Sequence, residues 1–293
     1  MLMGKKDYWR WSETVFVDKN KDWRQGDIIT CGIDVGSVST KAVIMVDGKL
    51  YAYSVVRTGV NTQENAKKAF LPLEEKTGIT VSNCSYIVGT GYGRINIPFA
   101  HKTITEIACH GKGASFVGGK NIRTILDMGG QDCKAIHIDE EGKVTNFLMN
   151  DKCAAGTGRG LELLAELLEI PIEELGVRSF DIDEEPEPVS NVCVVFARTE
   201  AYSLLKKGWS KNKVLAAYLR AIAERVSSLL MRIGIEPEFF VSGGISKNVG
   251  IVKRIERIIG LEAVKVDVDT QIIGAIGAAI FAKALYEKER GIS

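Results

Sequence analysis

Short apolar runs broken by glycine turns make up much of the first half of the chain. Residues 28–57 hold two runs rich in Val and Ile with Asp47–Gly48 between them, which predicts a β-hairpin that carries a Gly/Ser loop. Residues 123–150 repeat the order of apolar strand, Gly pair, polar turn and second strand, with Glu141–Gly142 at the later turn. A duplicated β-hairpin-plus-helix unit predicts an α/β protein with two similar lobes that face each other.

Helical spacing dominates the rest of the chain, where Leu, Ala and Ile recur every three or four residues. Residues 181–188 concentrate carboxylates and prolines, which predicts an exposed loop. The predicted strands are 85–88 and 239–241, each followed by a Gly-rich turn, and the predicted helices are 65–76, 104–114, 160–168, 213–233, 249–259 and 272–288.

The chain is expected to divide into an arm and two lobes. Residues 1–26 contain three of the four tryptophans, set among Lys and Arg, and this arm should either cross the protein's own surface or bind a partner. We place the boundary between the lobes near 118–121, so that 27–119 form the first lobe and 120–271 the second. Helix 272–288 starts on small residues that permit close packing, and we expect it to join the first lobe.

Composition excludes several classes of protein. A 45% hydrophobic fraction and 26% charged residues in 293 residues are typical of a globular chain with a large core. The 38 basic and 37 acidic residues leave a net charge of +1, which argues against nucleic acid as a partner. The longest uncharged apolar stretch, 270–282, is shorter than the ~18 residues needed to span a bilayer. No secretory segment opens the chain, so we expect a cytoplasmic protein without a membrane partner.

Two glycine turns each follow a strand that ends in aspartate. In residues 34–41 (DVGSVSTK) glycine lets backbone N–H groups approach an anion, and residues 127–132 (DMGGQD) repeat this from the other lobe. A phosphate chain between the turns would leave Asp34 and Asp127 facing a Mg²⁺ ion, as candidate catalytic residues. A third turn at 241–247 (VSGGISK) offers room for a purine and ribose. The candidate ATP-binding residues are Gly36, Ser37, Ser39, Lys41, Gly129, Gly130, Gln131, Gly243 and Gly244.

Each turn alone is weak evidence, but their order and the repeat resemble the phosphate and adenosine motifs of the actin, Hsp70 and sugar kinase superfamily of ATPases. The resemblance covers roughly residues 28–285 and implies a two-lobed fold with ATP and Mg²⁺ in the cleft. It also matches Glu106 to the superfamily's connecting helix between the lobes, although a solvated glutamate explains this residue equally well. The chain contains neither GxxxxGK[ST] nor a GxGxxG that opens a helix after a strand, so a Walker A ATPase and a dinucleotide-binding fold are excluded.

Two of the six cysteines stand beside possible ligand positions. Cys153 comes just before a Gly-rich turn that opens an apolar helix, where N–H groups would favour a thiolate. Cys193 lies in an apolar segment, and two cysteines are too few for a four-cysteine iron–sulfur cluster. Spacing alone therefore favours two buried structural cysteines. The other four, which we assign to packing, are Cys31, Cys84, Cys109 and Cys133.

The sequence motifs around Cys153 and Cys193 change that assignment. NDKCAAGTGR after LDMGGQD, and a later Cys-x-Val-Phe-Ala before Glu200, resemble the ATPase family that contains 2-hydroxyacyl-CoA dehydratase activators and the ATP-binding, delta-type subunits of benzoyl-CoA reductase. The resemblance implies a [4Fe-4S] cluster shared across a subunit interface, with Cys153 and Cys193 as this chain's ligands. It also implies a related ATPase subunit as partner in a homo- or heterodimer, catalytic acyl-CoA-binding subunits, and a ferredoxin-like electron donor.

Within this family, the Trp-rich arm and residues 196–202 favour the benzoyl-CoA reductase type, which couples ATP hydrolysis to low-potential electron delivery for aromatic ring reduction. One alternative is a homodimeric ATP-dependent activator of a 2-hydroxyacyl-CoA dehydratase. Another is a small-molecule kinase of the superfamily without iron, with Asp127 or Asp132 as its base. A non-redox nucleotide switch also stays open.

Overall fold

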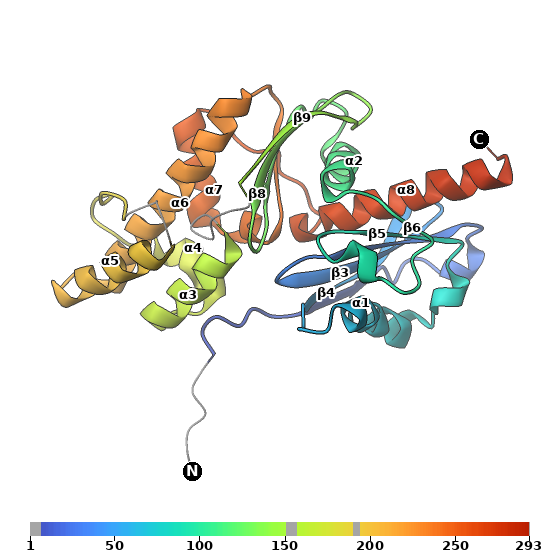
Figure 1. The fold of residues 1–293 in the computed structure, drawn as a ribbon, viewed down its shortest axis with the longest axis horizontal. Coiled ribbons are helices and arrows are strands. Elements are labelled where there is room, and N and C mark those ends of the chain that lie inside the picture. The colour runs from blue at the N-terminus through green and yellow to red at the C-terminus, as the bar shows by residue number, and fades with distance from the viewer. Residues whose placement is uncertain (1–6, 151–156, 190–193, 293) are drawn as a thin grey trace, which may run out of the picture.

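The computed structural model describes residues 7–150, 157–189 and 194–292, which form two sheets with helices around and between them (Figure 1). The first sheet has six strands in the order β1-β4-β3-β2-β5-β6. Its strands are β1 (Thr14–Val17), β2 (Ile29–Val35), β3 (Ser39–Val46), β4 (Lys49–Arg57), β5 (Tyr86–Thr90) and β6 (Lys102–Thr103). This sheet, with α1 (Thr62–Thr77) on one face, is called the first lobe below.

The predicted hairpin is present, but its first apolar run divides into two strands. The Gly/Ser loop separates β2 from β3, which are antiparallel and fully buried. Asp47 and Gly48 then turn β3 into β4 with positive φ at both residues, as a tight two-residue hairpin turn requires. The sequence therefore codes a three-stranded meander in which a loop, rather than a helix, follows the first strand.

The second sheet repeats this arrangement in the order β10-β7-β8-β9. Its strands are β7 (Thr124–Met128), β8 (Cys133–Ile138), β9 (Val144–Asn150) and β10 (Phe239–Ser242). The duplicated unit expected from the sequence is thus confirmed, with DMGGQD again between the first two strands. This sheet, with the helices on its outer side, is called the second lobe.

Seven further helices complete the described part of the chain. The largest, α6, carries the long apolar stripe that fills the core of the second lobe. Figure 1 shows α3 to α7 on the outer side of the second sheet and α2 and α8 between the two sheets. These helices are α2 (Glu106–Gly118), α3 (Gly158–Leu168), α4 (Leu175–Arg178), α5 (Val194–Lys206), α6 (Lys211–Ile233), α7 (Val249–Ile259) and α8 (Ile273–Arg290).

Glycines allow α2 and α8 to cross at backbone contact. A Cβ on Gly277 would lie 1.8 Å from the carbonyl oxygen of Cys109, and a Cβ on Gly113 would lie 2.1 Å from that of Ile273. On the other side of α8, a Cβ on Gly32 of β2 would lie 1.9 Å from the carbonyl oxygen of Ala275. The small residues at the start of the final helix therefore serve the close packing that holds the two lobes side by side.

The described part of the arm, 7–26, lies on the protein's own surface. β1 pairs with β4 in antiparallel register and adds an edge strand to the first sheet. Further along, the Trp23 indole donates to the carbonyl oxygen of Thr77 at 2.9 Å. Of the two roles expected for the arm, the structure shows the first, because the described part of the arm crosses the protein's own surface.

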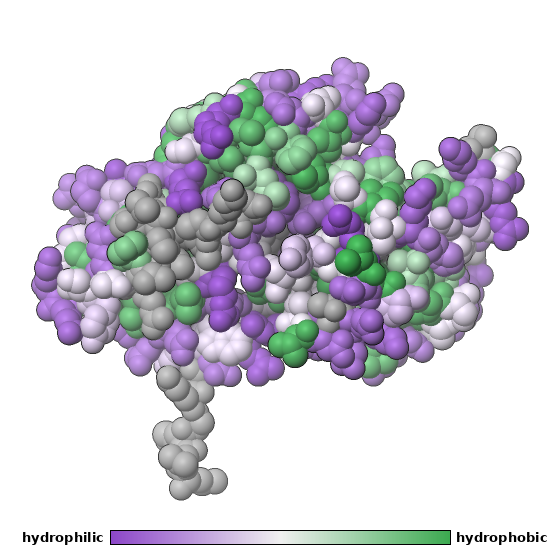
Figure 2. All heavy atoms as spheres, viewed as in Figure 1, coloured by the Kyte–Doolittle hydropathy of each residue, from purple (hydrophilic) through white to green (hydrophobic). Residues whose placement is uncertain are grey.

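Most of the side chains on the face drawn in Figure 2 are hydrophilic. None of the helices in the described ranges is both long enough and apolar enough to cross a bilayer. The four cysteines expected in packing, Cys31, Cys84, Cys109 and Cys133, are all buried, and none of these four is in a disulfide bond.

Candidate active site between the lobes

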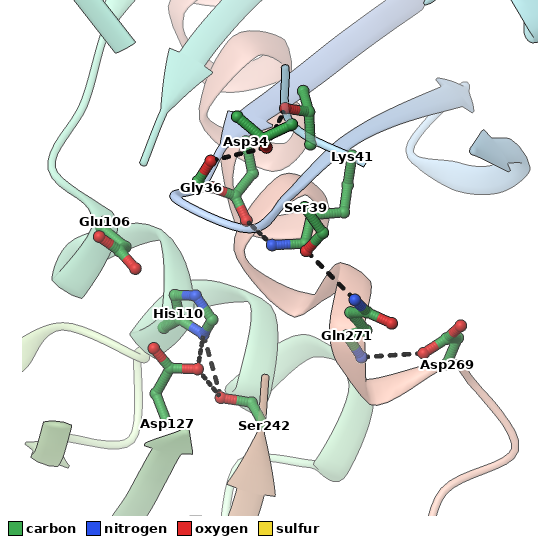
Figure 3. Close-up of polar contacts among 12 residues, drawn as sticks. Asp34, Gly36, Ser39, Lys41, Glu106, His110, Asp127, Ser242, Asp269 and Gln271 are labelled. Carbon is green, nitrogen blue, oxygen red and sulfur yellow. Dashed lines mark hydrogen bonds and ion pairs between the residues drawn. The ribbon is translucent and has the colours of Figure 1, made fainter. Parts of the chain in front are cut away.

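A cavity of about 370 Å³ lies between the lobes, within the size range of small-molecule sites. Residues from the ends of β2, β7 and β10 converge on it, because these strands end at the same edge of each sheet (Figure 3). Of the residues predicted for ATP and Mg²⁺, those that line the cavity are Asp34, Ser39, Lys41, Asp127, Gly129, Gly130, Gly243 and Gly244. Gly36, Ser37 and Gln131 do not line it; Gly36 closes the first turn through a bond to Ser39, and Gln131 is exposed.

Each duplicated unit brings one aspartate and one lysine together. Asp34 lies opposite Lys41 in the β2–β3 register, and Asp127 lies opposite Lys134 in the β7–β8 register. The Lys41 Nζ donates to Asp34 Oδ2 at 2.9 Å, and the Lys134 Nζ lies 3.7 Å from Asp127 Oδ2. Lys41 was predicted as a site residue and Lys134 was not, although Lys134 follows Asp127 by seven residues, as Lys41 follows Asp34.

Burial by itself would lower the pKa of both lysines, but the surrounding carboxylates outweigh it and raise each pKa above its ordinary value. Asp34 acts most strongly on Lys41, and Asp127 acts most strongly on Lys134, which also bonds Glu106 at 3.1 Å and Asp132 at 2.8 Å. Both lysines therefore stay cationic at neutral pH, and of the two Lys41 lines the cavity.

The Asp127 carboxylate is fixed by two neighbouring side chains. The Ser242 hydroxyl donates to Asp127 Oδ1 at 3.0 Å, and the His110 Nδ1 lies 3.3 Å from the same oxygen (Figure 3). Burial favours the neutral acid, but His110, Lys134, the bond from Ser242 and Lys41 together lower the pKa of Asp127 below its ordinary value. Asp127 is thus held as an oriented carboxylate.

Asp34 keeps one oxygen free. Its Oδ1 is buried without a hydrogen-bond partner in the part of the chain that the structure describes. A Cβ on Gly91 would lie 2.4 Å from this oxygen, so glycine there leaves space beside it. A buried carboxylate oxygen without a donor needs an explanation, and a cation with oxygen ligands such as Mg²⁺ fits it.

Glu106, His110 and Asp127 form a second set of donors. Their ligand atoms lie within 4.8 Å of one another. His110 Nδ1 is already within 3.0 Å of the Ser242 hydroxyl, and Mg²⁺ prefers oxygen. We therefore assign the carboxylates, rather than the imidazole, to any metal in this cavity.

The three glycine turns meet at the cavity. A Cβ on Gly130 would lie 2.4 Å from Val38, so the first and second glycine turns contact each other across the cleft. Gly243 adopts a φ of +87°, and a Cβ there would lie 2.3 Å from the carbonyl oxygen of Met128. Both positions need glycine, because a side chain at either one would overlap the opposite turn or strand.

Gln271 joins the first and third turns and was not expected from the sequence. Its side-chain amide donates to the Ser39 hydroxyl at 3.2 Å, and its backbone N–H donates to Asp269 at 2.9 Å (Figure 3). A lone Gln at the start of the apolar run 270–282 carries no signal of this role in the sequence. The pairing depends on the helix α8 that brings residues 269–271 back to the first lobe.

The family model of the BadF/BadG/BcrA/BcrD ATPases matches residues 31–282, which include all three turns and both aspartates. The chain belongs to this ATPase family. The family resemblance and the two-lobed α/β fold expected from the sequence are both confirmed.

Relatives of this family ATPase agree with that assignment. An activator of lactoyl-CoA dehydratase from Anaerotignum propionicum is 41% identical over 267 residues, which are 89% of this chain and 99% of the relative. One of the subunits of benzoyl-CoA reductase from Thauera aromatica is 30% identical over 270 residues, 89% of this chain and 95% of that protein. The activator of the 2-hydroxyisocaproyl-CoA dehydratase from Clostridium difficile, solved with bound ADPNP, superimposes with a TM-score of 0.86 at 37% identity, over 91% of this chain and 98% of that one.

In this family ATPase, Cys153 and Cys193 lie outside the described residues. The described residues that follow them begin helices α3 and α5, which pack against each other. The first N–H groups of α3, on Gly158 and Arg159, donate to the carbonyl oxygens of Gly129 and Gly130. The start of α3 is therefore bonded directly to the second glycine turn.

Proposed function

We propose that this ATPase is the ATP-hydrolysing activator of a 2-hydroxyacyl-CoA dehydratase. The observation that carries the proposal is its 39–41% identity to three dehydratase activators over almost their whole length. The benzoyl-CoA reductase function favoured by the sequence has weaker support, because the relative from that enzyme is 30% identical. The arm, which had suggested that function, precedes the family match and does not distinguish the two.

ATP is assigned to the cavity between the lobes. The N–H groups of the first and second turns face the phosphates, and the third turn, with Gly243 and Gly244, borders the nucleoside. Asp34 and Asp127 would hold a Mg²⁺ ion, which when bound neutralises phosphate charge. The bound ADPNP in the 37% identical relative supports a nucleotide in this fold.

Hydrolysis transfers the terminal phosphoryl group to water and leaves ADP and phosphate. Asp127 is the group we assign to orienting the attacking water and accepting its proton, because its carboxylate is fixed by Ser242 and His110. Lys41 lines the cavity, stays protonated and would stabilise the charge that spreads over the phosphoryl oxygens. Lys134, outside the cavity lining, stays protonated beside Asp127 and helps to keep that carboxylate ionised.

We further assign Cys153 and Cys193 to a [4Fe-4S] cluster shared with a second copy of this chain. Two thiolates from each copy would complete a four-cysteine ligand set. The activity would then be ATP-dependent delivery of electrons, received from a ferredoxin-like donor, to a separate dehydratase that binds the acyl-CoA.

The test compares three variants of the protein purified without oxygen. Cys153→Ser should lose iron and dehydratase activation but keep ATP turnover, whereas Cys84→Ser, which changes a cysteine buried in the first lobe, should keep all three. Asp127→Ala should keep iron and lose ATP turnover by at least about a hundredfold. Full dehydratase activation by Cys153→Ser would rule out the cluster, and ATP turnover only with a small hydroxyl substrate would favour the kinase.

A further inference from the structure

We propose that arm residues 8–13 and Arg57 form a clasp that joins the two lobes and forms one wall of the nucleotide cavity, so that it slows nucleotide release. The proposal rests on the proposed function, which places ATP in this cavity. Figure 1 shows the arm leaving the first sheet and crossing toward α3 of the second lobe.

The arm is bonded to both lobes. On the first lobe, β1 pairs with β4 and the Glu13 carboxylate accepts the backbone N–H of Arg57 at 2.9 Å. On the second lobe, the carbonyl oxygen of Tyr8 accepts the N–H of Ile172 at 2.9 Å, and the Ser12 N–H donates to Glu173 at 3.0 Å. Opening of the cleft must therefore break or stretch one of these two sets of bonds.

Arg57 forms the centre of the clasp. Its guanidinium lies 4.3 Å from the ring centre of Trp9 and 5.6 Å from that of Trp11. From the end of β4 it also donates to Glu162 of α3 at 3.2 Å, and the Glu162 side chain is only 3% exposed. Two arm indoles thus cover a cation that bridges the lobes, a contact that strengthens as it loses water.

The same segment borders the nucleotide cavity. Trp11, Ser12 and Thr14 line it together with Asp34, Asp127 and the three glycine turns, and Glu162 and Glu173 line it as well. A nucleotide in the cavity would therefore lie beside an indole that also holds the lobes closed.

The arm lies outside the part of the chain that matches the family. The alignment to the lactoyl-CoA dehydratase activator covers 99% of that protein but 89% of this chain, and the family match begins at residue 31. The clasp residues 8–13 lie before that match, whereas Asp34 and Asp127 lie within it. We therefore expect the clasp to change how long nucleotide stays, rather than the chemistry at Asp127.

The experiment measures release of a fluorescent ADP analogue from the full-length chain by chasing with excess ATP. Trp11→Ala should release it roughly tenfold faster, a typical loss for one aromatic anchor in a binding site, with a smaller change in the association rate. Arg57→Gln should do the same through the lobe contact. Trp23→Phe is the matched control, because Trp23 lies outside the cavity lining on the first lobe.

A second measurement depends on the indole itself. In Trp11→Phe, which keeps most of the packing, the change in tryptophan emission on adding nucleotide should disappear, whereas it should persist in Trp23→Phe. Equal release rates in wild type, Trp11→Ala and Arg57→Gln would overturn the clasp and leave the proposed function intact. A wild-type chain that binds no adenine nucleotide would overturn the proposed function, and the clasp with it.

Discussion

At the scale of single residues, the site depends on two matched pairs of opposite charge. Asp34 and Asp127 could be predicted, because an aspartate at a strand end before glycine is a recognisable local pattern. Lys134 was missed because it lies within an apolar strand. The alternation of side chains along such a strand does not show which of them will lie beside the charged groups between the two lobes. The available signal was that a lysine follows the aspartate by the same number of residues in both repeats, and the structure pairs the two residues in each.

Glu106 gives a prediction at this scale. Burial raises the pKa of Glu106, and although Lys134 opposes the rise, Asp34 and Asp127 add to it. From its ordinary pKa of about 4.3 up to the raised value, the folded chain binds more protons than the unfolded chain, so stability falls as pH rises. Glu106→Gln removes this loss, and we expect its melting temperature at pH 7 to exceed that of wild type by about 2 °C.

That gain should vanish below about pH 4, where Glu106 is protonated in both states. Thermal melts of the nucleotide-free chain across pH measure it. Glu140→Gln, at a side chain that is 83% exposed, is the control and should show no gain. A Glu106→Gln variant that melts below wild type at every pH would show that the carboxylate stabilises the fold.

At the scale of elements, hydrophobic period predicted most helices and strands, including 249–259 without error. It missed β1, because four residues at a sheet edge, none of them fully buried, leave too short a pattern. It also did not give α5, whose mixed surface lacks a clear apolar stripe. Both elements gain their structure from neighbours that are distant in sequence.

The crossing of α2 and α8 supplies the prediction at this scale. Gly277→Ala should destabilise the chain by about 2 kcal/mol or more, because the new methyl group would overlap the backbone of Cys109 and force the helices apart. Denaturant unfolding measures this. Gly260→Asn is the control, because this C-cap is left-handed with nothing within 4 Å of an added Cβ, and it should cost a few tenths of a kcal/mol. Equal losses in both variants would show that the crossing can relax.

At the scale of the whole molecule, ligand in the cleft should stabilise both lobes together. With Mg²⁺ and ADP at a hundred times the dissociation constant, linkage gives about 2.7 kcal/mol, which should raise the melting temperature by about 5 °C. Asp34→Asn should lose the part of the shift that needs Mg²⁺, while Glu140→Gln keeps all of it. The assignment of Mg²⁺ to Asp34 is wrong if omitting Mg²⁺, or changing Asp34, leaves the shift in melting temperature intact.

The bonds from the start of α3 to Gly129 and Gly130 have a thermodynamic consequence. Because these carbonyl groups belong to the turn assigned to phosphate, any second ligand whose binding displaces Gly158 must also change the affinity of the turn for nucleotide. Coupling between two binding sites is reciprocal, so nucleotide would change the affinity for that second ligand by the same factor. A titration of either ligand alone, with and without the other, would therefore measure one shared coupling constant.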